Sequence, residues 1–354
     1  MSLPESSVRG DFSRVPVIDL TNLRSPQLDE RRALAREIHD ACMQVGFFYI
    51  TNHGISQATI SALHEAACQF FALPDDRKSQ YSMANSKKFR GFMPLYAEQM
   101  TGLELQQPDP DNVSTPGAYS ESFDVGYELA ADPQREPHDS LPSDDFGLYG
   151  DNQWPSEDEL PGFRRTYIEY FAEALTLCRS LMRIFALALD LPEEFFDPMM
   201  EYPGATSRML HYPPQSANDT SRIGLGAHTD YECITILSQD KVPALQVRNS
   251  SEEWITVQPL PNTLVVNIAD CLSMWTNRRF KSTVHRVINI TGEERYTIPF
   301  FFGVDYNTTV SVLPSCISED SPACQKPFEA GEWVRRQLAA TYIGYGQRPP
   351  AEQR

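Results

Sequence analysis

The second half of the chain is a series of short β-rich runs separated by turns. From about residue 205 onward, runs of β-branched and aromatic residues such as "ITILSQD", "TLVVNIAD" and "RYTIPFFF" alternate with turn-forming residues. Short strands at this spacing are typical of an antiparallel sandwich or barrel. The sequence therefore predicts a double-sheet β core in this region.

Helical patterns surround this predicted core. Apolar residues recur at helical spacing over residues 29–46, 56–73, 162–191 and 328–343. The segment between the second and third helices is rich in Pro, Asp, Ser and Gly, and predicts long surface loops.

These patterns predict an α+β fold with a mainly β core. We divide it into an N-terminal helical and β module over 1–100, a loop-rich excursion over 101–160 that could act as a lid, and a catalytic unit over 161–354. The last segment combines a long helix, the β core and the C-terminal helix.

The composition is that of an acidic globular protein. The 354 residues are 41% hydrophobic and 22% charged, with a net charge of −18. This sign disfavours nucleic acid and anionic membrane surfaces as partners. Seven cysteines form no C-x-x-C pair, so neither a disulfide framework nor a structural zinc site is expected. With no signal-peptide pattern or membrane span in the sequence, we expect a cytoplasmic monomer or weak dimer acting on a small molecule.

His228 and Asp230 stand two residues apart at the start of a β-rich run, in "GAHTDYECITIL". On a strand, residues i and i+2 share a face and lie about 7 Å apart, so both side chains can reach one ion. An H-x-D pair alone is a weak signal. His285, the other histidine after residue 220, completes the two-histidine, one-carboxylate set of non-haem Fe(II) oxygenases. Ligand identity alone leaves Fe(II) and Zn(II) both open.

Arg295 and Thr297 form a second i, i+2 pair, in "RYTIPFFF". A guanidinium on so apolar a strand needs an anionic partner, and the Thr297 hydroxyl supplies another donor to the same group. A dicarboxylate such as 2-oxoglutarate fits this pair, with one end at the metal and the other at Arg295. A surface salt bridge is the competing interpretation, which the apolar strand disfavours.

Together these motifs resemble one known family. "HTDYECITIL", "STVHRV" and "RYTIPFFF", with the N-terminal "VPVIDL" and "GFFYITNHGI", are similar to the 2-oxoglutarate/Fe(II)-dependent dioxygenases of the isopenicillin N synthase-like branch. The resemblance covers nearly the whole chain. It implies a double-stranded β-helix (jelly-roll) core flanked by helices, with Fe(II), 2-oxoglutarate and dioxygen as reactants and ascorbate as a supporting reductant in vitro.

The resemblance also implies residue roles. His228, Asp230 and His285 would ligate iron, and Arg295 and Thr297 would bind the distal carboxylate of 2-oxoglutarate. Family members more often carry Ser in place of Thr297, but threonine keeps the hydroxyl.

Four further residues are candidates for binding. Tyr212 matches a family tyrosine that donates to the cosubstrate, although it could instead be a core residue. Arg90 aligns with a loop that lines the substrate pocket, the alternative being a surface arginine. Phe92 and Phe302 are candidates for the pocket wall, with the core as the alternative.

The function implied is oxidation of an unactivated C–H bond of a small organic molecule by hydroxylation, desaturation or rearrangement. The Pro-rich loops, and Leu210 where plant relatives often carry Asn, favour microbial or fungal secondary metabolism. The alternatives are a 2-oxoglutarate-independent oxidase of the isopenicillin N synthase type and a nucleobase methyl hydroxylase. A non-catalytic ligand-binding barrel and a zinc hydrolase are less favoured.

Overall fold

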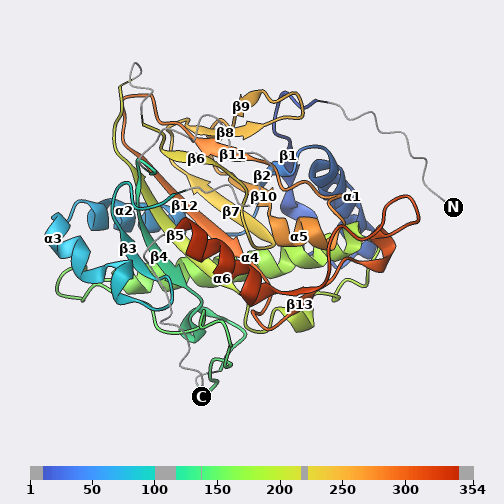
Figure 1. Ribbon diagram of the computed structural model, residues 1–354, viewed down its shortest axis with the longest axis horizontal. Helices are drawn as coiled ribbons and strands as arrows, with labels where there is room; N and C mark the ends of the chain where they lie inside the picture. Colours follow the sequence, from blue (N-terminus) through green and yellow to red (C-terminus); the bar gives the residue numbers. More distant parts are fainter. Residues whose placement is uncertain (1–10, 100–116, 137, 217–221, 343–354) are drawn as a thin grey trace.

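Two β-sheets face one another at the centre of the computed structural model, which describes residues 11–99, 117–136, 138–216 and 222–342. The large sheet has eight strands (Figure 1). In spatial order these are β1 (Val17–Asp19), β2 (Phe47–Thr51), β10 (Leu264–Ile268), β7 (Ile234–Gln239), β12 (Arg295–Phe302), β5 (Ala205–Tyr212), β4 (Glu121–Gly126) and β3 (Gly91–Met93). The first pair is parallel and the other pairs are antiparallel.

A four-stranded sheet lies on the other side of the core. Its order is β6 (Leu225–His228), β11 (His285–Val287), β8 (Leu245–Arg248) and β9 (Trp254–Thr256). A separate two-stranded ribbon consists of β13 (Thr309–Val310) and β14 (Phe328–Glu329). The jelly-roll core flanked by helices is therefore confirmed.

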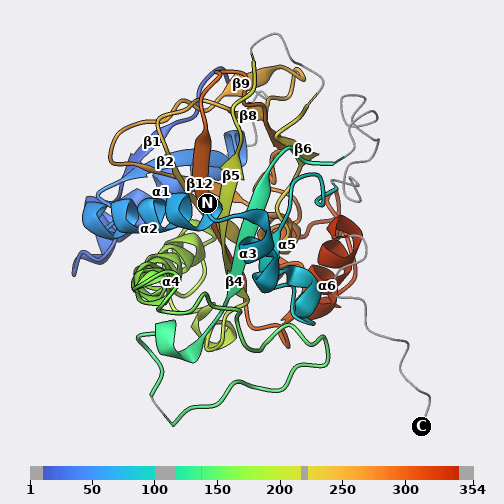
Figure 2. The same cartoon turned by 90° about the vertical axis from the view of Figure 1, so that its left-hand side faces the viewer.

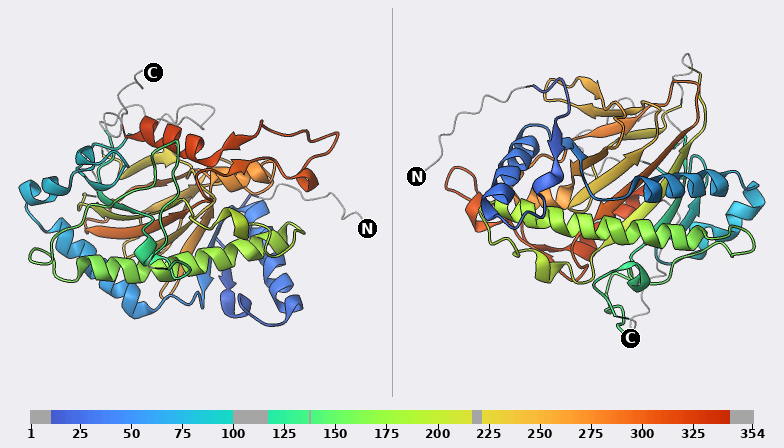
Figure 3. Two further views of the ribbon diagram at one scale, coloured as in Figure 1. Left: turned by 90° about the horizontal axis from the view of Figure 1, so that it is seen from below. Right: turned by 180° about the vertical axis from the view of Figure 1, so that it is seen from behind.

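Helices cover the outer face of the large sheet. The α-helices are α1 (Leu28–Gln44), α2 (Gln57–Phe71), α3 (Asp75–Lys78), α4 (Phe163–Ala188), α5 (Asp270–Trp275) and α6 (Ala330–Thr341). The long α4 runs beneath the sheet, with α1 and α2 beside it (Figure 3). Figure 2 shows these three helices on one side of the large sheet and α6 on the other. The last predicted helix begins two residues late, because Phe328 and Glu329 form a strand.

Local signals explain where the helices begin and end. The Ser56 side chain accepts from the backbone N–H of Thr59 and caps α2. After α1, Gly46 has φ +74° and donates to the carbonyl of Ala41. A Cβ at Gly46 would lie 2.1 Å from the carbonyl oxygen of Lys281, so the chain there requires glycine.

Alternation along the strands divides the core into two parts. On β12, Phe300 and Phe302 are fully buried with the helices, and Phe300 contacts Phe171 of α4 edge to face. The second cluster fills the space between the sheets and includes Leu210, Leu225 and Val287. The outer face of the large sheet thus anchors the helices, and its inner face forms the wall of a cavity.

The segment 101–160 differs from the loop-rich excursion expected there. Glu121–Gly126 form β4, which is hydrogen-bonded between β3 and β5 and buried throughout. Phe123 packs against Phe70, with ring centroids 4.5 Å apart. Turn-forming residues precede and follow this short strand, so the composition of the whole segment indicated loops. Residues 100–116, which include much of the predicted lid, lie outside the described residues.

No helix in the described ranges has both the length and the apolar run that crossing a bilayer requires.

Replacing Phe123 with alanine tests the place of β4 in the core. Because the ring is fully buried, Phe123→Ala should lower the free energy of unfolding by about 3–5 kcal/mol, measured by urea denaturation. Leu260→Ala is the control, since Leu260 is exposed, and should change it by no more than about 0.5 kcal/mol. Equal effects of the two substitutions would contradict the packing described here.

Candidate metal centre and its cavity

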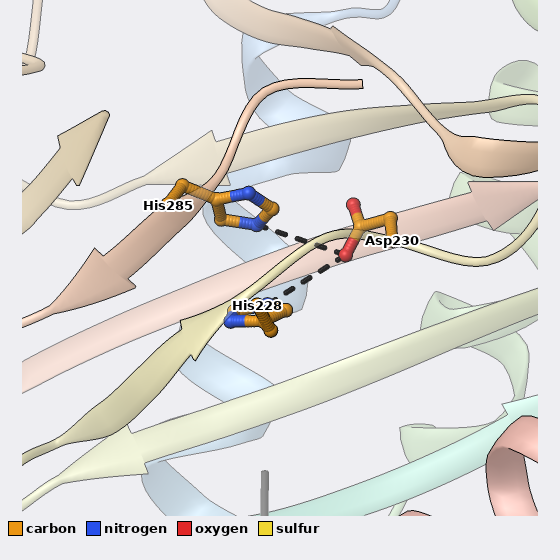
Figure 4. A group of neighbouring side chains, drawn as sticks. All are labelled: His228, Asp230 and His285. Carbon is orange, nitrogen blue, oxygen red and sulfur yellow. Dashed lines mark ion pairs between the residues drawn. The ribbon is translucent and has the colours of Figure 1, made fainter. Parts of the chain in front are cut away.

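His228 and His285 lie opposite one another on neighbouring strands. β6 ends at His228 and β11 begins at His285, and these two residues are partners in the antiparallel register. The chain then turns, and Asp230 reaches back toward both rings (Figure 4). Asp230 Oδ1 lies 3.7 Å from Nε2 of each histidine. We expected His228 and Asp230 to share one strand, but only His228 belongs to β6, and Asp230 lies in the turn that follows it.

Hydrogen bonds fix the tautomer of both imidazoles. His228 Nδ1 lies 2.8 Å from the carbonyl oxygen of Gly226, and His285 Nδ1 lies 3.1 Å from that of Thr283. A carbonyl can only accept, so each Nδ1 carries the hydrogen and each Nε2 keeps its lone pair. Ligand atoms of the three side chains all lie within 4.8 Å of one another. Two neutral imidazoles and a carboxylate thus present donor atoms to one point.

The surroundings keep Asp230 ionised and His285 neutral. Burial alone would raise the pKa of Asp230, but His285, His228 and two hydrogen bonds hold it below its ordinary value. Those bonds come from Thr235 and Asn267 to Oδ2, which leaves Oδ1 for a metal ion. Burial, aided by the neighbouring His228, lowers the pKa of His285.

Arg295 lies in the same cavity with one guanidinium nitrogen unpaired. Its side chain is 1% exposed; Nε donates to the carbonyl of Val242 and Nη2 donates to the Gln239 side chain. Nη1 is buried and has no hydrogen-bond partner in the described part of the chain. Burial lowers the pKa of Arg295. An anionic ligand would satisfy this nitrogen and the buried positive charge.

Two neighbours complete this end of the cavity. The guanidinium carbon of Arg295 lies 5.0 Å from the ring centroid of Tyr212, its register partner on β5. Thr297, two residues along β12, also lines the cavity. The sequence therefore predicted which residues gather here, namely Arg295, Thr297 and Tyr212.

A second group of charges lines the same cavity. Arg208, four residues before Tyr212 on β5, donates from Nε to Asp124 at 2.6 Å and from Nη1 to Glu98 at 2.7 Å. All three side chains are buried. Burial raises the pKa of Asp124, while Arg208 opposes this shift. Arg208 shares a strand face with Tyr212 and could have been found from period 2, whereas Asp124 and Glu98 carry no sequence signal.

The candidates for substrate contact divide into two groups. Arg90 is 3% exposed and lines the cavity. Phe92 and Phe302 do not: each is buried in the core that packs against the helices. On β12, the strand face of Arg295 and Thr297 continues to Phe301, which does line the cavity. The prediction that Phe302 lines the pocket was therefore wrong, and the next residue back, Phe301, lies there instead. Phe92 was also wrong, since its ring packs against Phe70.

Two other residues of the wall follow the H-x-D motif directly. Tyr231 and Glu232 both line the cavity. The Tyr231 hydroxyl is hydrogen-bonded to Thr341 of α6, and its carbonyl accepts from the Trp333 indole at 2.9 Å. α6 thereby closes one side of the cavity. Burial raises the pKa of Glu232 to about 8, and Arg90 opposes this shift.

Comparison with known proteins places this site in a family. Residues 203–304 match the model of the 2OG-Fe(II) oxygenase superfamily, and residues 15–157 match that of the non-haem dioxygenase in morphine synthesis N-terminal. The chain belongs to the 2OG-Fe(II) oxygenase superfamily.

Relatives of similar length support this membership. A 2-oxoglutarate-Fe(II) type oxidoreductase, ppzC, of Metarhizium majus is 35% identical, covering 92% of this chain and 87% of its own. The oxidoreductase hxnY of Emericella nidulans is also 35% identical, covering 92% and 90%. The crystal structure of a full-length Neurospora crassa protein in complex with alpha-KG is similar, with a TM-score of 0.78 and 27% identity over 93% and 96% of the two chains.

The residues present fit the family's two ligands. The donor set of two neutral imidazoles and one carboxylate suits Fe(II), and the unpaired Nη1 of buried Arg295 suits the distal carboxylate of 2-oxoglutarate. The protein is therefore an Fe(II)- and 2-oxoglutarate-dependent oxygenase.

Asn267 provides a test of how Asp230 is held. Asn267 donates to Asp230 Oδ2 at 2.8 Å and so orients Oδ1. Asn267→Leu should weaken Fe(II) binding by about 10–100-fold, measured by anaerobic titration. The exposed Asn307 supplies the control, Asn307→Leu, which should bind the metal as the wild type does. An unchanged affinity in Asn267→Leu would show that Asp230 needs no such support.

Proposed function

We propose that His228, Asp230 and His285 hold Fe(II), and that Arg295, Thr297 and Tyr212 hold 2-oxoglutarate. The observation that supports this most directly is the convergence of the three ligand side chains beside an unpaired, buried Arg295 nitrogen. Bound Fe(II) supplies the oxidising chemistry, in which 2-oxoglutarate and dioxygen give succinate and carbon dioxide while the substrate is oxidised.

The chain contributes position and exclusion of water. Leu225, Leu245 and Val287 line the cavity between the sheets and are buried. Such walls keep the ends of the cosubstrate dry, so the charge of Arg295 acts at low dielectric. The substrate, a small organic molecule, occupies the part of the cavity near Arg90, where an unactivated C–H bond is oxidised.

We further propose a role in microbial or fungal secondary metabolism. The fungal oxidoreductases among its relatives support this, including 2-oxoglutarate-dependent dioxygenase citB of Monascus ruber at 35% identity. A cytoplasmic location, a monomeric or weakly dimeric state and the lack of a nucleic-acid partner stay predictions from the sequence.

Two alternatives within the fold are less favoured. An oxidase of the isopenicillin N synthase type would use Arg295 for a substrate carboxylate, but the similar fungal proteins are named for 2-oxoglutarate. A nucleobase methyl hydroxylase is suggested by the structure of the same N. crassa protein with alpha-KG and thymine, at 27% identity. Oxygen uptake with 2-oxoglutarate omitted separates the first alternative from the proposal.

Loss of the metal ligands should abolish turnover. His228→Ala and Asp230→Ala each remove one of the three converging donors, so succinate release from 2-oxoglutarate in the presence of Fe(II) should fall to background. Chelation of the metal from the wild type should do the same, with recovery on adding Fe(II). His39→Ala is the control, since His39 lies at the surface of α1. Normal iron-dependent succinate release in either ligand variant would refute the assignment.

A further inference from the structure

Three buried side-chain atoms of the cavity wall have no hydrogen-bond partner in the part of the chain that the structure describes. They are Arg295 Nη1, Arg90 Nε and Glu232 Oε2. The 2-oxoglutarate carboxylate accounts for the first. The other two, on a guanidinium and a carboxylate, are not used by the metal or the cosubstrate.

Glu232 is a buried carboxylate with no counter-charge in contact. Glu232 is 7% exposed, and its side chain forms no hydrogen bond or ion pair with the described residues. The Glu232 side chain packs against Gly303, the residue that follows β12. A Cβ added to Gly303 would lie 3.1 Å from Glu232 Oε2. Since burying a carboxyl oxygen without a hydrogen bond destabilises a fold, its presence in this wall points to a ligand.

Arg90 is similarly buried without a carboxylate partner among the described residues. Its Nη1 and Nη2 donate to the carbonyls of Phe89 and Leu148, both at 3.3 Å. The Arg90 guanidinium lies against Gly126: a Cβ added to Gly126 would be 1.9 Å from Arg90 Nε. Arg208 in the same cavity has two carboxylates at 2.6 and 2.7 Å. The fold therefore pairs one cavity arginine with two carboxylates, whereas the other contacts the Tyr306 hydroxyl and keeps its Nε unpaired.

Arg90 and Glu232 line the same cavity, and no ion pair joins these two described residues. The unpaired Nε of Arg90 is a donor, and the unpaired Oε2 of Glu232 can accept. A donor and an acceptor that line one cavity without contact leave space for a group that accepts from one and donates to the other.

We propose that Arg90 and Glu232 determine substrate specificity by binding a neutral amide or lactam, whose carbonyl accepts from Arg90 and whose N–H donates to Glu232. This inference rests on the proposed function of the cavity. An amide suits the site because it presents one acceptor and one donor side by side. The aromatic side chains of Phe89, Phe301 and Tyr342, which line the same cavity, favour an otherwise apolar ring or chain.

A set of matched six-membered rings tests this recognition. The protein loaded with Fe(II) and 2-oxoglutarate is titrated under nitrogen, so that binding is measured calorimetrically without turnover. 2-Piperidone offers both the acceptor and the donor, whereas N-methyl-2-piperidone and cyclohexanone offer only the acceptor. Piperidine offers a cationic donor, and pipecolic acid offers a zwitterion. We expect 2-piperidone to bind at least about ten-fold more tightly than each of the others.

Variants separate recognition from folding. Glu232→Leu and Arg90→Met keep the approximate side-chain volume and should each remove the preference for 2-piperidone. Glu232→Gln retains an acceptor and should restore most of it. Because Glu232 has no partner to lose among the described residues, Glu232→Leu should unfold at the same temperature as the wild type or a higher one. The control is Glu169→Gln, on the exposed surface of α4, which should preserve the preference.

The outcomes distinguish this inference from the proposed function. If 2-oxoglutarate fails to bind the wild-type protein, the proposed function itself is wrong. If it binds but the five rings show equal affinity, or Glu232→Leu keeps the preference, the inference is overturned. Tightest binding of piperidine or pipecolic acid would also overturn it, because the site would then select a charged group.

Discussion

The antiparallel register that sets His228 opposite His285 is the contact on which the site depends. It places two imidazoles side by side at the ends of β6 and β11, and the turn after β6 adds Asp230. Both strands belong to the small sheet, whereas Arg295 projects from β12 in the large one. A metal ion at the small sheet and an anion at Arg295, both of which we propose, would be joined by a ligand that spans the space between the sheets. A 2-oxoacid with a second carboxylate has that form.

The cavity departs from the rule that buried polar atoms find partners, and it does so only at particular points. Within the described wall, the atoms left without one are Arg295 Nη1, Arg90 Nε and Glu232 Oε2. Arg208, with Glu98 and Asp124, shows that the same cavity can satisfy a buried charge fully. Unsatisfied groups are expected where a ligand completes the structure. The paired residues, such as Arg208, maintain the cavity, and we propose that the residues with unpaired atoms contact a ligand.

The sequence predicted the β core, the helices and the clustering of the candidate metal and cosubstrate residues. These features depend on local period and on motifs with fixed spacing. It misplaced Phe302, although the period of two that links Arg295 and Thr297 leads to Phe301. It missed β4, whose six residues lie among turn-forming segments. Glu98 and Asp124 could not be found, since only tertiary packing brings them to Arg208. Ion pairs between residues far apart in the chain cannot be predicted from local sequence patterns.

The most direct measurement compares 2-oxoglutarate with 2-oxopentanoate, which keeps the metal-binding oxoacid but lacks the distal carboxylate. Both are titrated onto the Fe(II)-loaded protein and onto its Arg295→Met variant. If the unpaired Arg295 nitrogen receives the distal carboxylate, the wild type binds 2-oxoglutarate more tightly by at least about ten-fold, as expected for a buried, charge-assisted contact. The variant should then bind the two acids alike. Equal affinities in the wild type, or a preference that survives in Arg295→Met, would contradict the account.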